Sequence, residues 1–454
     1  MVITRDIINE TYELISTLIQ NKCVNPPGNE IKSIKTIDRF LKSKGIASKI
    51  YKVTEKKANL VAIIKGVNVS HPGLIFGPSH VDVVPVPNSD EWEVEPFAGE
   101  IKDGFIWGRG AMDMLYIVAT QIQAFCLLHE EGFRPKGDLV LLIVCDEETG
   151  SNLGTKWMIE NHLEEIIDSN KEYCAISEYG GMHLSKNKIA ILIAGKGVFW
   201  KRLKFQGKPG HGSIPFGVNS AIIKSVKAIE KLNRYFSSRV PFTTKYLKNL
   251  AFGLSVGFIQ RLMITTKFLL PFTLKLLKKI DPETARVIHA LSRMTVSCNR
   301  VQGGDKVNVI PSEAYVDLDI RTLPEQDLEY VNKHLKKALG PLYKEAEILT
   351  PEKESIAIKG NSSSIDNRFF KTIAKVTKQE FPEAQLVHVL DPGFTDLIYL
   401  RNLGINSYGY TLCDEKTTME DFTQYQHGTN ERISVKTTEL TLKLYYNTAK
   451  EFLK

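Results

Sequence analysis

The feature that limits the possible folds most is a change, in the middle of the chain, in the order of predicted strands and helices. Up to about residue 196, short apolar runs bounded by Gly, Pro or charged residues alternate with amphipathic helical stretches, an order typical of an α/β sheet. From about Gly197 the order becomes strand, helix, strand, strand, helix, strand, as in a ferredoxin-like domain. After about Pro351 the first pattern resumes. We therefore expect a discontinuous α/β domain, residues 1–196 and 352–454, and an inserted domain, residues 197–351.

The periodicity of apolar residues predicts the individual elements. Helices are expected at residues 7–19, 31–43, 116–131, 219–232, 325–339, 368–380 and 435–453. Strands are expected at residues 60–64, 73–76, 139–145, 199–205, 294–301, 314–321, 346–349 and 385–389. A chain of 454 residues exceeds the length at which one hydrophobic core stops growing, which supports two domains.

Residues 237–291 interrupt the ferredoxin-like order with helical, basic and apolar material, such as Phe268 to Phe272. This amphipathic character would suit a membrane surface. We favour a different interpretation, in which the segment is an extra helical layer that covers the inserted domain or a seam between two copies of the chain.

Composition narrows the classes of function. Apolar residues make up 43% and charged residues 24%, the ordinary balance of a globular protein. The net charge of +7 is interpreted as spread along the chain rather than gathered in an arm, which argues against nucleic-acid binding.

The location of the protein is predicted to be cytoplasmic. Six cysteines lie far apart and form no C-x-x-C pair, so we expect reduced thiols rather than a cysteine-bound zinc site. The N-terminus has no basic segment followed by an apolar run, so no secretion signal is expected. No uninterrupted apolar run approaches the roughly 20 residues of a membrane-spanning helix.

His80 and Asp82 follow the predicted strand 73–76 after three intervening residues. This places them at the carboxyl end of a strand, where open α/β sheets build their sites. A metal-bound His usually passes its other N–H to an oxygen, and Asp82 is placed to serve His80 in that way. Taken alone, the pattern is equally compatible with a surface His beside an Asp.

Asp113 ends the segment from Gly108 to Asp113, directly before the predicted helix 116–131. The glycines allow a tight backbone there, which side chains would block. A carboxylate held so rigidly could bridge two metal ions, or it could cap the start of the helix.

Asp146, Glu147 and Glu148 place three carboxylates at the end of the predicted strand 139–145. Such neighbours raise one another's pKa unless a cation is present. One of them can bind a metal while its neighbour faces the attacking water. A solvated acidic loop is the alternative.

Glu178 ends the apolar stretch 173–176, and His427 lies ahead of the last predicted helix. Either could also be an ordinary loop residue. The chain has neither the G-x-x-x-x-G-K-[ST] spacing of a phosphate loop nor the G-x-S-x-G of a serine hydrolase, so those two classes lose support.

Together these residues resemble the dinuclear zinc hydrolases that include aminoacylases, acetylornithine deacetylase, succinyl-diaminopimelate desuccinylase, glutamate carboxypeptidase and carboxypeptidase S. The resemblance covers nearly the whole chain, and its most specific parts are residues 80–85, 92–97, 108–113 and 146–148. It implies a three-layer α/β/α catalytic domain with a mixed sheet, and an inserted ferredoxin-like lid or dimerisation domain.

The resemblance also implies two divalent ions per chain, with Zn²⁺ as the first choice and Co²⁺ or Mn²⁺ as alternatives. Its match to this chain predicts one ion at His80, Asp113 and Glu178, and the other at Asp113, Glu148 and His427. Asp113 would then be the bridging ligand.

Two further roles follow from the resemblance. Asp82 would orient His80, and Glu147 would act as general base and then as general acid. Two cations would lower the pKa of a water between them, and Glu147 would take its proton before the attack on the amide carbonyl.

In this family the inserted domain carries dimer contacts and lends a His to the partner's site, a position that His211 matches. We therefore expect a homodimer in which His211 stabilises the oxyanion, although a turn His would look the same. Substrate-binding positions of the family are matched by Asn308, Arg321, Gly393 and Thr395. An Arg there can hold a substrate carboxylate through two hydrogen bonds.

Two positions depart from the family pattern. Leu115 stands where a Lys is usual, which should leave the metal ligands intact. Phe394 stands where a Gly is usual, which puts the shape of the pocket for a substrate carboxylate in question.

The expected substrate is an N-acyl amino acid or a short peptide with a free carboxylate. In related enzymes a Glu at the Glu178 position accompanies carboxypeptidase, acylase or desuccinylase activity, and the insertion 237–291 looks similar to that of carboxypeptidase S and the vertebrate N-acyl-amino-acid hydrolases. The alternatives are a dipeptidase, a deacetylase or desuccinylase of amino-acid biosynthesis and, from another class, a non-catalytic metal-stabilised binding protein.

Overall fold

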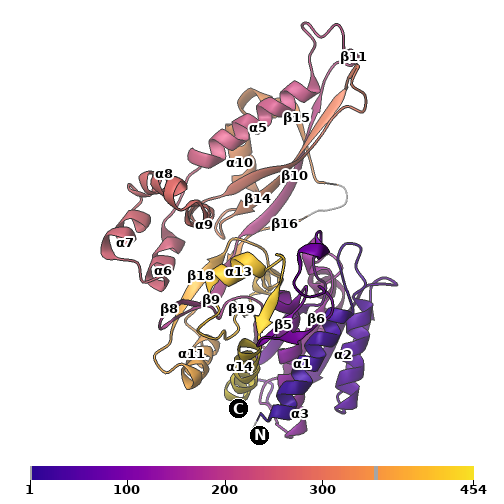
Figure 1. Ribbon diagram of the computed structural model, residues 1–454, viewed down its shortest axis with the longest axis vertical. Coiled ribbons are helices and arrows are strands. Elements are labelled where there is room, and N and C mark those ends of the chain that lie inside the picture. Colours follow the sequence, from indigo (N-terminus) through magenta and orange to yellow (C-terminus); the bar gives the residue numbers. More distant parts are fainter. Residues whose placement is uncertain (1–2, 352–355) are drawn as a thin grey trace.

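The computed structural model describes residues 3–351 and 356–454, which form two bodies (Figure 1). Both ends of the chain lie together in the larger body, and the middle of the chain forms the smaller one. The chain passes from the larger to the smaller body where β9 (Lys188–Gly195) is followed by β10 (Gly197–Gln206). The predicted start of the second catalytic segment, residue 352, lies outside the described residues.

A mixed sheet forms the centre of the larger body. Its strands lie in the order β1 (Ser48–Lys52), β2 (Ala58–Ile64), β6 (Leu139–Val144), β3 (Gly73–His80), β7 (Tyr173–Ser177), β19 (Asn406–Gly409), β9 and β17 (Asn361–Ser362), and β18 (Gln385–Asp391) and β8 (His183–Ser185) also pair with β9. β3 is parallel to both of its neighbours, β6 and β7. The carboxyl ends of these three strands therefore meet at one edge of the sheet.

Helices cover both faces of this sheet. On one face lie α1 (Arg5–Gln20), α2 (Ile31–Ser43), α3 (Tyr116–Glu130), α11 (Arg368–Glu380) and α14 (Val435–Leu453). On the other lie α4 (Thr155–Ile166) and α12 (Leu397–Asn402). Successive residues of β3 join different cores, since Leu74 and Phe76 pack with the first group and Ile75 with the second. The larger body therefore has the three-layer α/β/α arrangement with a mixed sheet that the resemblance implies.

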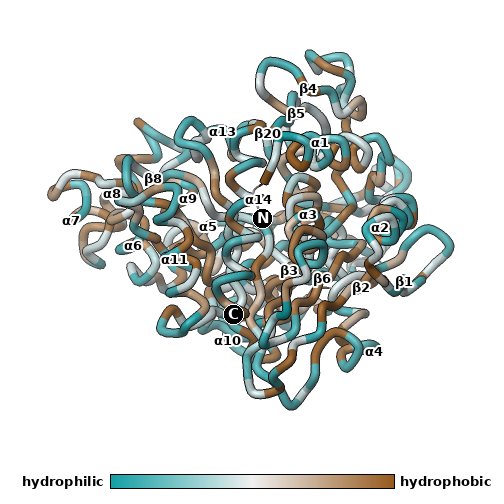
Figure 2. Tube along the Cα trace, turned by 90° about the horizontal axis from the view of Figure 1, so that it is seen from below, coloured by the Kyte–Doolittle hydropathy of each residue, from teal (hydrophilic) through white to brown (hydrophobic). Residues whose placement is uncertain are grey.

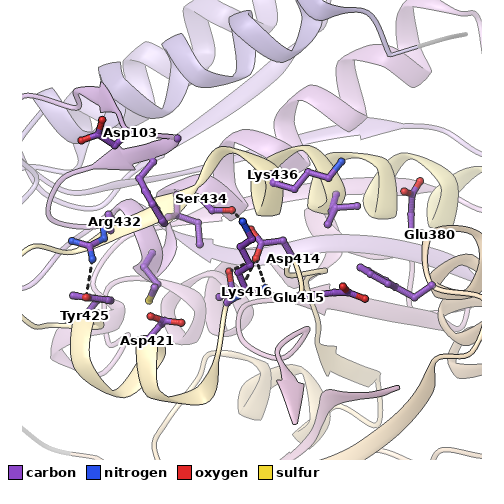
Figure 3. A pocket seen from close by; sticks show the side chains of 17 residues that line it. Asp103, Glu380, Asp414, Glu415, Lys416, Asp421, Tyr425, Arg432, Ser434 and Lys436 are labelled. Carbon is purple, nitrogen blue, oxygen red and sulfur yellow. Dashed lines mark hydrogen bonds between the residues drawn. The ribbon is translucent and has the colours of Figure 1, made fainter. Parts of the chain in front are cut away.

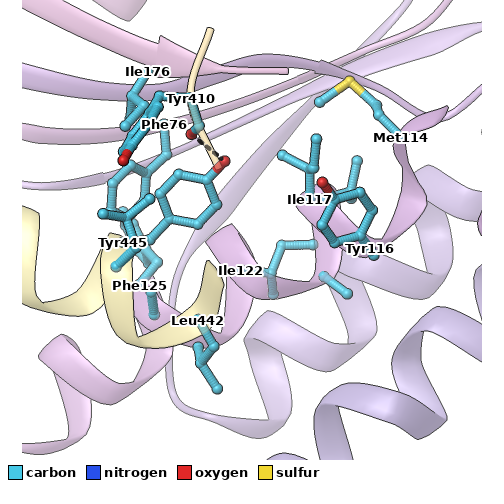
Figure 4. Packing of buried hydrophobic residues seen from close by; sticks show 14 of the residues in the cluster. Phe76, Met114, Tyr116, Ile117, Ile122, Phe125, Ile176, Tyr410, Leu442 and Tyr445 are labelled. Carbon is cyan, nitrogen blue, oxygen red and sulfur yellow. Dashed lines mark hydrogen bonds between the residues drawn. The ribbon is translucent and has the colours of Figure 1, made fainter. Parts of the chain in front are cut away.

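The centre of the main core lies between the sheet, α3 and α14 (Figure 4). The ring of Phe76 lies 5.6 Å from that of Tyr445, whose hydroxyl donates to the carbonyl oxygen of Tyr410 at 3.1 Å. α3 and the residues before it, Ala111–Glu130, are long and apolar enough to cross a membrane, but their whole apolar window is buried inside the protein. Core packing therefore accounts for the apolar character of this helix.

The smaller body is built on an antiparallel sheet in the order β12 (Thr295–Gln302), β14 (Glu313–Thr322), β10 and β15 (Ala346–Leu349), with β16 (Ala357–Ile358) also paired to β10. α5 (Ala221–Ser238) and α10 (Leu328–Leu339) pack on one face of it, over Phe199, Leu203 and Phe205. In chain order this is strand, helix, strand, strand, helix, strand, the ferredoxin-like order that the sequence predicts.

The insertion between α5 and β12 forms α6 (Lys245–Gly253), α7 (Phe258–Thr265), α8 (Leu270–Ile280) and α9 (Pro282–Ser292). Leu247 and Leu250 of α6 pack in one cluster with Ala194 of β9 and Leu390 of β18, which belong to the larger body. The expectation that this layer covers the inserted domain is therefore incomplete, because the helices pack across the junction between the two bodies.

Lys196, the residue between β9 and β10, is fully buried at this junction. Its ammonium group donates to the carbonyl oxygens of Ala290 and Arg293, at 2.9 and 3.0 Å, and to the hydroxyl of Thr295 at 3.2 Å. Burial lowers the pKa of Lys196 to about 7. The crossing between the bodies is thus tied to the end of α9.

Candidate metal centre

The parallel strands bring the predicted metal ligands together. His80 is the last residue of β3, and Glu178 directly follows β7. Glu148 lies in a short 3-10 turn, Glu147–Thr149, just after β6. Because β6, β3 and β7 are neighbours in the sheet, their carboxyl ends place these side chains at one edge.

Asp113 lies between two groups of metal-binding side chains. On one side, His80 Nε2 is 3.3 Å from Asp113 Oδ1 and 3.5 Å from Glu178 Oε2. On the other side, His427 Nε2 is 3.2 Å from both Asp113 Oδ2 and Glu148 Oε1. Each carboxylate oxygen of Asp113 therefore faces one group, as a ligand shared by two ions must.

The donor atoms fit a pair of divalent cations. His80 Nε2 and Glu148 Oε1 are buried and form no hydrogen bond within residues 3–351 and 356–454. Buried polar atoms normally form a hydrogen bond, whereas these two have ion-pair contacts instead, so a metal would supply the missing bond. Atoms of His80, Asp113 and Glu148 lie within 4.8 Å of one another. Imidazole and carboxylate together suit zinc, cobalt or manganese.

The site is electrostatically costly without cations. Burial raises the pKa of Glu178 to about 8, although His80 opposes this effect. Burial and the charge of Glu178 raise the pKa of Glu147 well above its usual value. Burial would lower the pKa of His427, but Asp113 and Glu148 outweigh it and raise this pKa to about 10. These groups hold protons that bound metal would displace.

Glu431 holds the backbone of Asp113 in place. Its carboxylate accepts hydrogen bonds from the backbone N–H groups of Met112 and Asp113, at 2.9 and 3.1 Å. Its other oxygen accepts a hydrogen bond from Arg109 Nη1 at 2.7 Å. The side chains of Glu431, Arg109 and Asp113 are all buried. Glycine is needed nearby, since Gly110 has φ +86° and a Cβ there would lie 2.3 Å from Val83.

The alternative role of Asp113, as the cap of the following helix, does not match the structure. α3 begins at Tyr116, and its N-cap position is occupied by Leu115. The carboxylate of Asp113 points instead to the two histidines. Sequence reasoning did not find Glu431, because a single Glu before the short strand β20 (Arg432–Ser434) carries no local pattern.

Asp82 acts on the site through two different groups. Its backbone carbonyl oxygen is the nearest partner of His80 Nδ1, at 2.9 Å, whereas its carboxylate lies 3.6 Å from that nitrogen. The carboxylate instead accepts hydrogen bonds from the backbone N–H groups of Glu147 and Glu148, at 3.2 and 3.1 Å. The same residue thus contacts the ring of His80 and the turn that carries both glutamates.

A buried hydrogen-bond network, which the sequence analysis did not predict, supports Asp82 and through it the turn that carries both glutamates. Asn25 Nδ2 donates to the carboxylate of Asp82 at 2.8 Å. The ammonium group of Lys57 contacts the carboxylate of Asp146, lies 3.0 Å from Asn25 Oδ1 and lies 3.5 Å from Glu30. One buried cation therefore lies among several carboxylates.

Two more residues contact Asp113 and were missed by the sequence analysis. Gln426, which follows α13 (Met419–Tyr425), donates to Asp113 Oδ2 at 2.7 Å. The hydroxyl of Tyr179 lies 3.4 Å from the same oxygen and also contacts Gln426. They lie beside predicted ligands in sequence, but neither residue type is a usual metal ligand.

His211 and Asn308 lie away from this cluster within one chain. β11 (Gly210–His211) pairs with β13 (Val309–Ile310) at the tip of the smaller body that points away from the larger one (Figure 1). His211 is exposed, and its Nδ1 lies 2.7 Å from the hydroxyl of Ser213. Within one chain, these two residues therefore do not join the predicted metal ligands.

Of the remaining predicted substrate-binding residues, Arg321 lies near the end of β14, and Gly393 and Thr395 lie in the loop between β18 and α12. The guanidinium of Arg321 binds Asp319 of its own strand, at 2.7 and 3.2 Å. The backbone N–H of Gly393 donates to Asp391 at 2.9 Å, and Thr395 is buried. Contact of these residues with a substrate stays a prediction.

A cavity of about 590 Å³ lies elsewhere in the larger body (Figure 3). The described residues that line it include none of the predicted metal ligands. Several of its charged groups already have partners, since Arg432 donates to the hydroxyl of Tyr425 at 2.7 Å and Ser434 donates to Asp414. The donor atoms around Asp113, and not the size of a cavity, therefore identify the candidate site.

Comparison with known sequences agrees with this geometry. A family model described as peptidase family M20/M25/M40 matches residues 78–451. A probable carboxypeptidase S-like 2 of Dictyostelium discoideum is 28% identical over 405 residues, covering 86% of this chain and 74% of the relative. An N-fatty-acyl-amino acid synthase/hydrolase of Mus musculus is 26% identical over 381 residues, covering 81% of this chain and 72% of the relative.

Solved structures show the same fold. An M20 family metallo-carboxypeptidase from Sulfolobus solfataricus superposes with a TM-score of 0.74 at 18% identity, covering 98% of this chain and 99% of the other. A dinuclear metal binding peptidase of the M20 family from Bacillus subtilis superposes with a TM-score of 0.63 at 15% identity, covering 99% of both chains.

The first testable prediction concerns the buried network. Lys57→Met removes the one buried cation beside the carboxylates of Glu30, Asp146 and Asp82 among the described residues. Because an uncompensated buried charge is unfavourable, we expect the free energy of unfolding to fall by about 3–5 kcal/mol. Urea unfolding of the metal-free protein measures it. The control is Lys52→Met, an exposed lysine paired with Glu55, for which we expect a change within about 0.5 kcal/mol. Equal stability of the two variants would contradict the role of Lys57.

Proposed function

We propose that this chain, which belongs to peptidase family M20/M25/M40, releases an amino acid from an N-acyl amino acid or from a short peptide with a free carboxylate. The chain is a hydrolase that acts on peptide or amide bonds. The observation that carries the proposal is the carboxylate of Asp113, which turns one oxygen to each of two groups of metal-binding side chains.

We propose one set of ligands for each of two divalent ions. His80, Asp113 and Glu178 would hold one ion, and Asp113, Glu148 and His427 the other. When bound, the ions would polarise the scissile carbonyl and make a water molecule more acidic. We propose Zn²⁺ as the metal, with Co²⁺ and Mn²⁺ as alternatives, because the ligands are imidazoles and carboxylates.

Glu147 is the proton carrier in this proposal. It belongs to neither ligand group, and its Oε2 lies 3.9 Å from His80 Nε2, at the edge of the cluster. Burial raises its pKa, so its carboxylate readily accepts a proton. Glu147 takes the proton of the attacking water and later passes it to the leaving nitrogen. Asp82 fixes the backbone of this residue.

Two arguments support an N-acyl amino acid or a short peptide as the substrate: the names of two relatives and the chemistry of Arg321. Relatives include a protein named carboxypeptidase S-like 2 and one named an N-fatty-acyl-amino acid synthase/hydrolase, and both names fit release of an amino acid. Arg321 offers a planar pair of donors that could exchange Asp319 for a substrate carboxylate. A dipeptidase or a deacetylase or desuccinylase remains the alternative, and Phe394 is the position that would shape the pocket differently.

The assembly and location are also proposals. His211 and Asn308 lie at an exposed tip, so we propose a homodimer in which each copy completes the other's site. The six cysteines are free thiols, and five of them are buried, which suits a reducing cytoplasm.

The metal and the substrate class are tested together. We expect about two divalent ions per chain by elemental analysis, and hydrolysis of N-acyl amino acids that exceeds hydrolysis of the matching amides without a carboxylate. Dipeptides in the same panel distinguish a dipeptidase. Protein without bound metal and without activity on added zinc or cobalt would contradict the proposal.

Removing the proton carrier should separate catalysis from metal binding. Glu147→Gln keeps the shape of the side chain but removes the proton acceptor, so we expect kcat to fall by about 10²–10⁴-fold with metal content unchanged. Steady-state kinetics and elemental analysis measure both. Glu164→Gln, an exposed carboxylate outside the site, is the control and should keep full activity. Near-normal turnover of Glu147→Gln would assign the proton to another group.

Mixed dimers test whether His211 acts across copies. His211→Ala and Glu147→Gln subunits should each be inactive alone. Equal mixing should recover roughly a quarter of the wild-type activity, because about half of the dimers are then mixed and each mixed dimer has one intact composite site of two. Activity of subunits mixed after brief dissociation measures this. No recovery, in dimers shown to have exchanged, would contradict the cross-subunit role.

A further inference from the structure

Helices α7 and α8, together with the turn between them that holds Phe268, carry large apolar side chains that face away from the protein. Phe258, Phe268 and Phe272 are exposed by 81, 89 and 66%, and Ile259 and Ile280 are also exposed. These helices project from one side of the molecule, and hydrophobic stretches of α7 lie at its outer edge (Figures 1 and 2). Apolar side chains gathered in this way on a protein surface usually mark a contact with a partner or a membrane.

α8 is apolar on two opposite faces. Leu270 and its neighbours at helical spacing, Leu274 and Leu277, pack inward on the cluster at the junction of the two bodies. Phe272, Leu276 and Ile280 recur every four residues and form a stripe on the outside. A helix that only covers a core has a polar outer face. The outer stripe therefore is not needed for packing within the chain.

Basic residues predominate along the segment that carries this stripe, and the first acidic residues after it are Asp281 and Glu283. Residues 241–280 contain seven basic residues and no acidic one, namely Lys245, Lys248, Arg261, Lys267, Lys275, Lys278 and Lys279. The stretch alone thus carries a charge of +7, equal to the net charge of the whole chain, which corrects the expectation that the positive charge is spread evenly. Lys245 is paired with Glu325, whereas Lys275, Lys278 and Lys279 are exposed and form no salt bridge within residues 3–351 and 356–454.

We infer that this basic apolar face, made by the outer sides of α7 and α8, docks on the surface of a membrane that contains anionic phospholipids. Phenylalanines that enter the boundary of the acyl chains, flanked by lysines that face phosphate groups, are the chemistry that such a surface binds. A second copy of the chain fits less well, because a symmetric contact would bring lysines against lysines. The inference does not depend on the proposed reaction.

Flotation of the full-length protein with lipid vesicles tests this. We expect the protein to float with vesicles of phosphatidylcholine and phosphatidylserine, and roughly tenfold less with vesicles of phosphatidylcholine alone. Raising the salt concentration from about 0.05 to about 0.5 M should release much of the bound protein, because salt screens the attraction.

Two pairs of variants and controls separate the apolar and the charged parts of the face. Phe268→Ser with Phe272→Ser should lower vesicle partitioning at least about tenfold, and the control is Val67→Ser with Val69→Ser, two exposed residues elsewhere on the surface. Lys278→Glu with Lys279→Glu should have a similar effect. Its control is Lys336→Glu with Lys337→Glu, two lysines in the last turn of α10 as the first pair is in the last turn of α8.

Three results would overturn the inference. The first is that the wild-type protein does not float with anionic vesicles at low salt. The second is that each variant pair partitions like its control while melting temperatures are unchanged. The third is that the Phe268→Ser and Phe272→Ser variant loses a dimer, seen by sedimentation velocity, without any change in flotation, which would assign the face to a second copy.

Discussion

The two oxygens of the Asp113 carboxylate lie beside two different groups of predicted metal ligands. The packing of the larger body is what brings these groups to opposite sides of one side chain. The parallel strands β6, β3 and β7 bring His80, Glu148 and Glu178 to one edge, where buried carboxylates would repel without cations. Glu431 then fixes the backbone of Asp113 from a distant segment. Backbone hydrogen bonds and buried charge pairs therefore hold the predicted donor atoms in place.

The two bodies of the chain carry different predicted functional residues. The larger body carries the predicted metal ligands, whereas His211 lies at the far tip of the smaller one. The helical insertion packs across the junction, where Lys196 is tied to the end of α9. A movement between the bodies would therefore have to carry these helices along. The metal centre, the tip and the basic apolar face thus lie on three different parts of the molecule.

Much of the fold could be predicted from local pattern. The expected helices at residues 31–43, 368–380 and 435–453 and the strand at 346–349 have the bounds that the structure shows. Strand β1, the long strand β9 and helix α13 were not expected. β9 is almost entirely buried and lacks alternation, so periodicity does not distinguish it from a helix segment. α13 is a single short helix, too brief for a periodic signal.

The sequence by itself determined which residue types could bind metal and which strands precede them, because both depend on the order of neighbouring residues, although β3 runs to His80 and not only to residue 76. Only the tertiary structure decided that the two oxygens of Asp113 face different histidines, and that Glu431, Lys57 and Asn25 support the site. It also decided that the apolar residues of α8 lie on two faces, one of them exposed. Contacts between residues hundreds of positions apart follow from how strands and helices pack, which local order does not encode.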